Sequence, residues 1–321
     1  YMTQAVIKGV GAYLPTKRLT NTDLEKMVQT SDAWIRERTG IQERRIAADN
    51  ELTSDLARQA ALEALQDAGL TASDIDLIIL ATTTPDDTFP ATACKVQQQL
   101  GMTGGFAFDI QAACSGFLYA LSVADAYITQ GRVHRVLVIG AETLSRIVDW
   151  SDRNTCVLFG DGAGAVVLEG SADKTDSGIL SVLLRSDGRY RDLLLSSGGV
   201  SRTQTAGFIH MEGREVFRHA VENMAQIAKD VLQQQRLTPA DIDYLVPHQA
   251  NVRIIEATRT KLGLPADKVI LTLQQQGNTS AASIPLALHT GIRSGRIQRG
   301  DLLLLESMGG GLTWGAGLIR F

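Results

Sequence analysis

FDIQAACSGFLYA, residues 108–120, joins a short apolar run to a helical pattern through small residues and a cysteine. Apolar side chains recur with helical spacing from Phe117 onward, so the segment predicts a strand, a tight turn and a helix. Cys114 stands at the predicted first turn of that helix. The positive end of a helix dipole favours a thiolate, and we expect a lowered thiol pKa there. Cys114 is therefore a candidate nucleophile.

A second interpretation is that Cys114 belongs to the core, because free cysteine usually behaves as a small apolar side chain. The neighbouring residues favour the reactive interpretation. Positions 112, 113, 115 and 116 hold Ala, Ala, Ser and Gly, which leave space around the sulfur. A close-packed core would fill that space.

Composition limits the function classes that fit this chain. It has 321 residues, of which 44% are hydrophobic and 21% charged, as expected for one layered unit or two globular domains. The net charge of −4 gives no reason to expect nucleic acid as a partner. Three widely separated cysteines predict no disulfide framework and indicate a reducing compartment, so we expect a cytoplasmic protein. No apolar run approaches the roughly 18 residues of a membrane span, and no metal-binding motif occurs.

Strand and helix patterns alternate along the first half of the chain. Residues 75–81 and 133–139 predict buried strands, residues 106–110 predict another strand, and residues 56–68 and 114–130 predict helices. This alternation predicts an α/β sheet with helices on its faces.

Two patterns of the first half recur in the second. Residues 65–76 match 232–243 at an offset of 167, and residues 131–142 match 295–306 at an offset of 164. We predict an internal duplication with halves 1–170 and 171–321. The second offset pairs Cys114 with Asn278, at the start of another apolar helix, so the two are predicted neighbours.

Two further segments carry candidate groups. His248 ends a predicted strand in the second half, where α/β proteins place their ligands. A lone histidine is commonly structural. Here, however, the predicted strand that His248 follows duplicates the strand at 75–81, in the half of the chain that contains Cys114. Residues 309–311 are three glycines, which form either a flexible turn or a loop whose N–H groups reach a reacting oxygen. The presence of Cys114, His248 and Asn278 elsewhere in the chain favours the second interpretation, a loop whose N–H groups reach a reacting oxygen.

These segments resemble those of β-ketoacyl-[acyl-carrier-protein] synthase III, a condensing-enzyme family with the thiolase fold. The resemblance covers essentially the whole chain. It rests on AACSG at 112–116, FGDGAG at 159–164, PHQAN at 247–251, GNTS at 277–280 and GGGLTWG at 309–315. Elongating synthases use Cys–His–His instead, and a thiolase carries a second cysteine just before the three glycines. The resemblance implies an internally duplicated, layered αβαβα fold.

The resemblance also implies a reaction. Cys114 would attack an acyl-CoA primer and hold the acyl group as a thioester, with backbone N–H groups of Cys114 and Gly310 stabilising the oxyanion. His248 and Asn278 would hold the thioester oxygen of malonyl-acyl-carrier protein while CO₂ leaves. The family implies a homodimer and no cofactor or metal. Alternatives that use the same cysteine are acyl transfer to another acceptor, thioester hydrolysis and condensation in a secondary pathway.

Matching family positions imply three groups of binding residues. Those for coenzyme A are Trp34, Arg38 and Arg153. Those for the primer pocket are Phe89, Leu144, Phe159, Ile209 and Met308, with Phe89 reaching into the partner subunit's pocket. Those for the acidic carrier protein are Arg218, Arg253 and Lys261, for which a solvated face is an equal alternative. Met308 stands where many relatives have phenylalanine, which leaves the primer length open.

Overall fold

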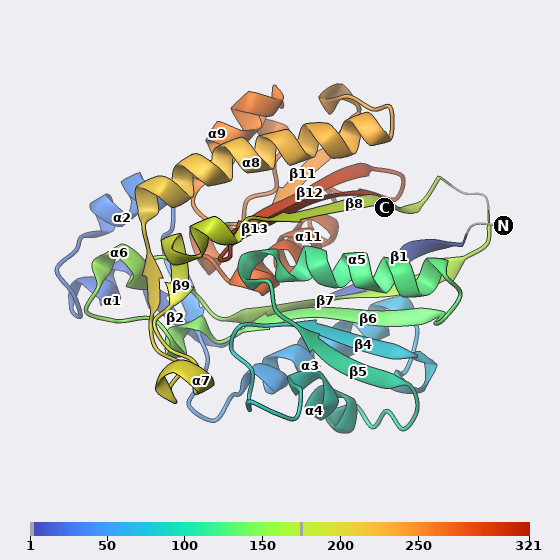
Figure 1. Ribbon diagram of the computed structural model, residues 1–321, viewed down its shortest axis with the longest axis horizontal. Helices are drawn as coiled ribbons and strands as arrows, with labels where there is room; N and C mark the ends of the chain where they lie inside the picture. The colour runs from blue at the N-terminus through green and yellow to red at the C-terminus, as the bar shows by residue number, and fades with distance from the viewer. Residues whose placement is uncertain (1–2, 174–175) are drawn as a thin grey trace.

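The computed structural model describes residues 3–173 and 176–321. Over these residues the chain forms two large sheets that lie one above the other (Figure 1). The first sheet has the strand order β1 (Gln4–Tyr13), β7 (Gly162–Ser171), β6 (Arg135–Glu142), β4 (Leu77–Ala81) and β5 (Phe106–Ile110). The second has the order β11 (Tyr244–Pro247), β12 (Leu302–Gly309), β13 (Thr313–Arg320) and β8 (Gly178–Ser186).

The two sheets share one topology. In the first, β4 runs parallel to β5 and β6, whereas β7 runs antiparallel to β6 and β1. In the second, β11 runs parallel to β12, whereas β13 runs antiparallel to β12 and β8. The place of β5 is taken in the second sheet by a parallel bridge between Leu245 and Val269.

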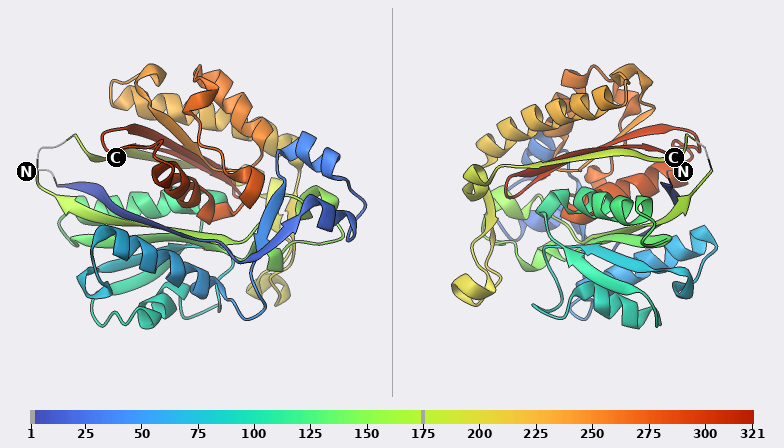
Figure 2. Two further views of the ribbon diagram at one scale, coloured as in Figure 1. Left: turned by 180° about the vertical axis from the view of Figure 1, so that it is seen from behind. Right: turned by 45° about the vertical axis from the view of Figure 1, so that its right-hand side comes forward.

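Helices make three layers around the sheets. The middle layer holds α5 (Gly116–Thr129) and α11 (Ser283–Arg293), and both lie between the sheets when the molecule is seen from the front and from behind (Figures 1 and 2). Outside the first sheet are α3 (Thr53–Ala68) and α4 (Thr92–Gln99). Outside the second are α8 (Gly213–Gln234) and α9 (Val252–Leu262). The layers therefore alternate as α, β, α, β, α.

Shorter elements surround one end of these layers. The helices are α1 (Asn21–Glu25), α2 (Asp32–Thr39), α6 (Arg153–Cys156), α7 (Val200–Thr203) and α10 (Leu273–Gln276). The strands are β2 (Lys17–Thr20), β3 (Glu43–Ile46), β9 (Leu194–Ser196) and β10 (Ile209–Met211). No helix of the described ranges is both long enough and apolar enough to cross a membrane.

Burial explains the composition of the layers. The middle helix α5 is apolar on most sides because it packs against both sheets, with Phe117, Leu118 and Leu121 fully buried. The outer helix α3 presents alanines to β1, and a Cβ at Gly11 would come 2.0 Å from the carbonyl oxygen of Ala60. Glycine on the strand and alanine on the helix thus allow a close approach of the two backbones.

The element bounds correct one detail of the predicted duplication. Arg135 corresponds to Leu302 at the strand starts, and Gly116 to Ser283 at the helix starts, both at an offset of 167. The predicted pairing of Cys114 with Asn278 at an offset of 164 is therefore wrong as an equivalence. The first five matched residues, 131–135, reach the start of β6 at Arg135, whereas their counterparts, 295–299, end three residues before β12 begins at Leu302.

The corresponding turns have the same unusual backbone. Each middle helix is preceded by a 3₁₀ turn, Ala113–Ser115 in the first half and Ser280–Ala282 in the second. Ala113 has φ 48° and Ser280 has φ 51°, which is rare for residues other than glycine. Such backbone is concentrated at functional sites, and these two turns lie at the site described next.

Candidate active site

One cavity of about 980 Å³ collects the three predicted reactive side chains, Cys114, His248 and Asn278. Cys114 lies in the turn before α5, His248 follows β11, and Asn278 precedes the turn before α11. Their exposed fractions are 8%, 4% and 7%. Cys114 and Asn278 therefore line the same cavity, as predicted, although they do not occupy equivalent positions in the two halves of the chain.

Backbone contacts hold Asn278 against the segment of Phe159. The Asn278 N–H donates to the Leu158 carbonyl at 2.8 Å, and the Gly160 N–H donates to the Asn278 carbonyl at 2.9 Å. Its side-chain oxygen accepts from the Ser280 N–H at 2.9 Å. The carboxamide oxygen is therefore used by the protein, and the Nδ2 hydrogens are what Asn278 offers to a ligand.

His248 is fixed by its backbone, and its ring is neutral. The His248 N–H donates to the Glu306 carbonyl at 2.8 Å, which ties it to β12. Burial lowers the pKa of the imidazole to about 3, and among the described residues Nδ1 has no hydrogen-bond partner. A neutral imidazole carries one N–H, so His248 is suited to donate one hydrogen bond.

Burial also decides the state of Cys114, against the sequence prediction. Burial is the main cause of a rise in the pKa of the thiol to about 12, while a hydrogen bond from Ser280 acts to lower this pKa and the nearby Glu142 carboxyl group acts to raise it. The predicted lowering of the pKa is therefore wrong. A helix terminus contributes about 0.3–1 kcal/mol, whereas burying a charge shifts a pKa by up to about 5 units. The resting pair is a neutral thiol and a neutral imidazole.

This state predicts a distinctive pH dependence of alkylation. Because the pKa lies near 12, the thiolate fraction and the iodoacetamide reaction of Cys114 should rise about tenfold per pH unit from pH 7 to pH 10. Peptide mass spectrometry would follow the Cys114 adduct, with a cysteine in a short peptide as a control whose rate flattens near its pKa of about 8.5. A plateau of the Cys114 rate below pH 8 would contradict the assignment.

Two buried carboxyl groups near the site were missed from the sequence. Glu142 accepts from the hydroxyls of Thr82 at 2.7 Å and Thr83 at 2.6 Å, and burial raises its pKa. Ser280 also hydrogen-bonds to Glu142, so one hydroxyl interacts with both Cys114 and this carboxyl group. A signal was available, because β4 and β6 are parallel neighbours whose carboxyl ends carry the threonines and the glutamate.

The second carboxyl group belongs to Glu306 on β12. Its side chain is fully buried, and neither oxygen has a hydrogen-bond partner among the described residues. Burial raises its pKa to about 8. The group is therefore mostly protonated at neutral pH, which avoids an unpaired charge in the core.

The glycine loop lies directly against the nucleophile. A Cβ at Gly309 would come 2.6 Å from the Cys114 nitrogen, so only glycine fits there. Ser307 donates its hydroxyl hydrogen to the Cys114 carbonyl at 2.7 Å, and Gly310 and Gly311 line the cavity. The loop and the cysteine thus form one wall of the site.

The residues predicted for the primer pocket divide into two sets. The cavity is lined by Leu144, Phe159, Ile209 and Met308. All four are buried. Phe89 is 83% exposed and is not part of the lining of its own chain's cavity.

The residues predicted for coenzyme A gather at one place outside the cavity lining. The guanidinium carbon of Arg38 lies 4.8 Å from the ring centroid of Trp34, and that of Arg153 lies 4.7 Å from it. Trp34 and Arg38 come from α2, and Arg153 begins α6. Segments more than a hundred residues apart therefore form one cation–π cluster.

The basic residues predicted for the carrier protein lie on the outer helices of the second half. Arg253 and Lys261 are exposed on α9, which packs against α8. Arg218 on α8 forms an ion pair with Glu215 at 2.7 Å. Its charge is partly neutralised, so α9 presents the less compensated part of this surface.

Comparison with known proteins identifies the family. Residues 108–188 match the family model 3-oxoacyl-[acyl-carrier-protein] synthase III, and residues 232–321 match the model of its C-terminal part. A β-ketoacyl-[acyl-carrier-protein] synthase III from Rhodospirillum centenum is 61% identical, and the match covers 99% of both chains.

Solved structures agree in fold. A 3-oxoacyl-[acyl-carrier-protein] synthase III from Aquifex aeolicus is 53% identical with a TM-score of 0.94, covering 99% of this chain and 100% of that one. The priming β-ketosynthase of the R1128 polyketide pathway also gives a TM-score of 0.94, at 33% identity, covering 99% of this chain and 96% of that one. The predicted thiolase-like fold is confirmed. This chain belongs to the β-ketoacyl-[acyl-carrier-protein] synthase III family of condensing acyltransferases.

Proposed function

We propose that this protein condenses an acyl-CoA primer with malonyl-acyl-carrier protein, releasing CO₂ and starting fatty-acid synthesis. The observation that carries the proposal is the meeting of the buried side chains of Cys114, His248 and Asn278 in one cavity beside the glycine loop. The relatives' names support synthesis of a 3-oxoacyl group on acyl carrier protein.

The first half-reaction loads the enzyme. The Cys114 sulfur bonds to the thioester carbonyl carbon of acyl-CoA, the bond to the coenzyme A sulfur breaks, and the thiol proton of Cys114 leaves with coenzyme A. One thioester replaces another, so the exchange is nearly balanced in free energy. The backbone N–H groups of Cys114 and Gly310 stabilise the negative oxygen of the tetrahedral intermediate.

The second half-reaction forms the carbon–carbon bond. The neutral His248 ring and the Asn278 amide donate to the thioester oxygen of the malonyl group. As the bond to its carboxylate breaks, that electron pair forms an enolate whose charge develops on this oxygen. The enolate carbon attacks the acyl carbonyl, Cys114 leaves as a thiolate that regains a proton, and departure of CO₂ drives the reaction forward.

Binding roles follow the positions of the remaining residues. Trp34 and Arg153 would enclose the adenine ring of coenzyme A, and Arg38 would meet its phosphates. Arg253 and Lys261 on α9, with Arg218 on the neighbouring helix α8, would contact the acidic carrier protein. The acyl chain would lie along the buried primer residues, which are Leu144, Phe159, Ile209 and Met308.

The assembly proposed here is a cytoplasmic homodimer of duplicated chains, each with halves 1–170 and 171–321. The exposed edge strand β5 supports pairing with a second copy. Phe106 on β5 is 41% exposed, and its ring centroid lies 6.4 Å from that of Phe108 and 5.7 Å from that of Tyr127. The exposed Phe89 would then enter the partner subunit's pocket.

The test is to load the protein with acyl-CoAs of increasing chain length and weigh the intact protein. We expect an adduct of one acyl group for the chains that the cavity accepts, and its disappearance with formation of a 3-oxoacyl product after malonyl-acyl-carrier protein is added. Absence of an adduct with every primer would reject the proposal. Release of free fatty acid without condensation would instead show that the protein hydrolyses thioesters, which is the alternative function.

A further inference from the structure

Arg44 on β3 is fully buried and binds neutral oxygen atoms of three residues from two segments of the chain. Its guanidinium donates to the carbonyl of Leu19 at 3.0 Å, to the carbonyl of Val157 at 2.8 Å, and through both terminal nitrogens to Oδ1 of Asn21 at 3.0 Å. Burial lowers its pKa to about 10, which leaves it a cation at neutral pH. The planar fork of arginine suits such multiple attachment.

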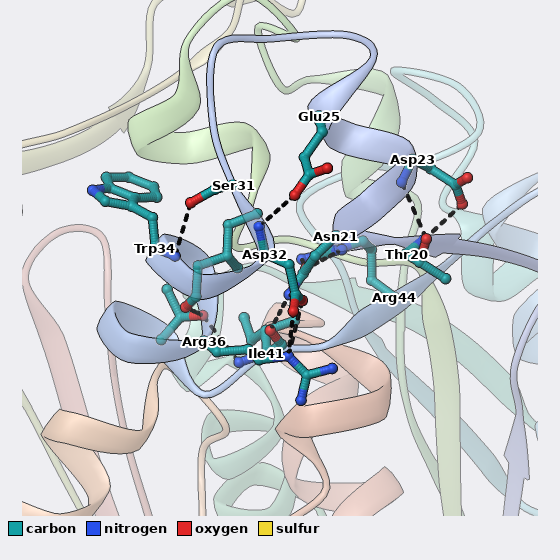
Figure 3. Close-up of polar contacts among 12 residues, drawn as sticks. Thr20, Asn21, Asp23, Glu25, Ser31, Asp32, Trp34, Arg36, Ile41 and Arg44 are labelled. Atoms are coloured by element: carbon teal, nitrogen blue, oxygen red, sulfur yellow. Dashed lines mark hydrogen bonds and ion pairs between the residues drawn. The ribbon is translucent and has the colours of Figure 1, made fainter.

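Asn21 extends this network to both ends of α2 (Figure 3). Its Nδ2 donates to Oδ1 of Asp32 at 2.9 Å and to the carbonyl of Ile41 at 2.8 Å. Asp32 is the first residue of α2, and Ile41 follows the glycine that ends it. A single buried carboxamide therefore holds the beginning and the end of this short helix while accepting from Arg44.

The network also reaches the other side of the cation–π cluster. Val157, which accepts from Arg44, directly follows α6, and α6 begins with Arg153. The helix that carries Trp34 and the helix that carries Arg153 are thus joined through two side chains whose hydrogen bonds, among the described residues, go to other groups. The network is buried, whereas Arg153 is exposed and its Nη1 donates to the Gln29 carbonyl at 3.3 Å.

The separation of the buried network from the exposed Arg153 side chain matters for the stacking of an aromatic ligand on Trp34. With its guanidinium carbon 4.7 Å from the indole centroid, Arg153 occupies the face that an aromatic ligand would use. A ring enters between them only if the guanidinium moves outward while the two helices keep their spacing. A buried support that does not include the Arg153 side chain meets this requirement, since small misplacements of binding groups reduce binding strongly.

We propose that Asn21 and Arg44 are positioning residues that set the spacing of Trp34 and Arg153 for the nucleotide of acyl-CoA. The inference rests on the proposed function and deepens its coenzyme A site. It requires that a change in the network affects substrates that carry the nucleotide and spares those that lack it.

The test compares acyl-CoA with acyl-pantetheine, which has the same thioester but no nucleotide. Asn21→Ala and Asp32→Ala should raise KM for acyl-CoA about three- to tenfold, the factor of one net hydrogen bond, and leave kcat and the KM for acyl-pantetheine near wild type. Asp32→Asn loses the same charge but keeps an oxygen that accepts from Asn21, so it should restore the KM for acyl-CoA.

Two further variants make the outcome decisive. Asp23→Ala is a matched control, because that carboxylate is on the same segment and bonds locally to Thr20. Equal KM changes for both substrates, or none in the Asp32→Ala protein, would overturn the inference. Trp34→Ala tests the nucleotide site itself: if it leaves the preference for acyl-CoA unchanged, the proposed coenzyme A site fails as well. Should Asn21→Ala not fold, the Asp32 pair decides alone.

Discussion

Cys114→Ala is expected to remove the acyl adduct and lower the rate of condensation by at least about 10⁴-fold, because the variant lacks the atom that holds the primer. Decarboxylation of malonyl-acyl-carrier protein should persist, since His248 and Asn278 remain. Intact-mass measurement with acyl-CoA reports the first effect, and release of labelled CO₂ reports the second. Loss of the adduct and persistence of decarboxylation can be separated because different side chains serve the two half-reactions.

Cys94→Ala supplies the matched control for this experiment. Cys94 is a free cysteine on α4 whose thiol donates to the Ala107 carbonyl at 3.6 Å, and it does not line the cavity. The control should load with the acyl group and condense like the unchanged protein. If Cys114→Ala still acquired an acyl group that Cys94→Ala lost, the nucleophile would be misassigned.

The segment around Cys114 could be predicted from the sequence because its signals are local. An apolar run, small residues and a helical repeat specify β5, the turn and α5 without knowledge of the rest of the chain. His248 was found by a topological argument, since strand ends in an α/β sheet gather at one edge. Both arguments use rules that hold before tertiary packing is known.

The ionisation of the site could not be predicted in this way. Burial, which raises the pKa of Cys114 and lowers that of His248, is a property of the assembled layers. The same holds for the network of Arg44. An arginine in a short polar strand gives no sign in the sequence that it will be fully buried and will join residues 113 positions apart.

Asn278→Ala is expected to keep the acyl adduct on Cys114 and to lower decarboxylation and condensation by about 10²- to 10³-fold, the usual effect of removing one oxyanion donor. The adduct persists because loading does not use the Asn278 amide. The assay weighs the loaded protein and measures CO₂ release from malonyl-acyl-carrier protein on the same sample.

Asn278→Asp separates the catalytic contribution of this residue from its structural one. The side-chain oxygen of Asn278 accepts from the Ser280 N–H at 2.9 Å and so supports a turn whose φ of 51° is unusual for serine. Aspartate keeps that acceptor but, ionised at about pH 8, has no hydrogen to donate to the developing enolate. If donation is the function, both variants lose decarboxylation and both still load. Near-normal CO₂ release by Asn278→Asp alone would show that support of the turn, and not donation, is what Asn278 contributes.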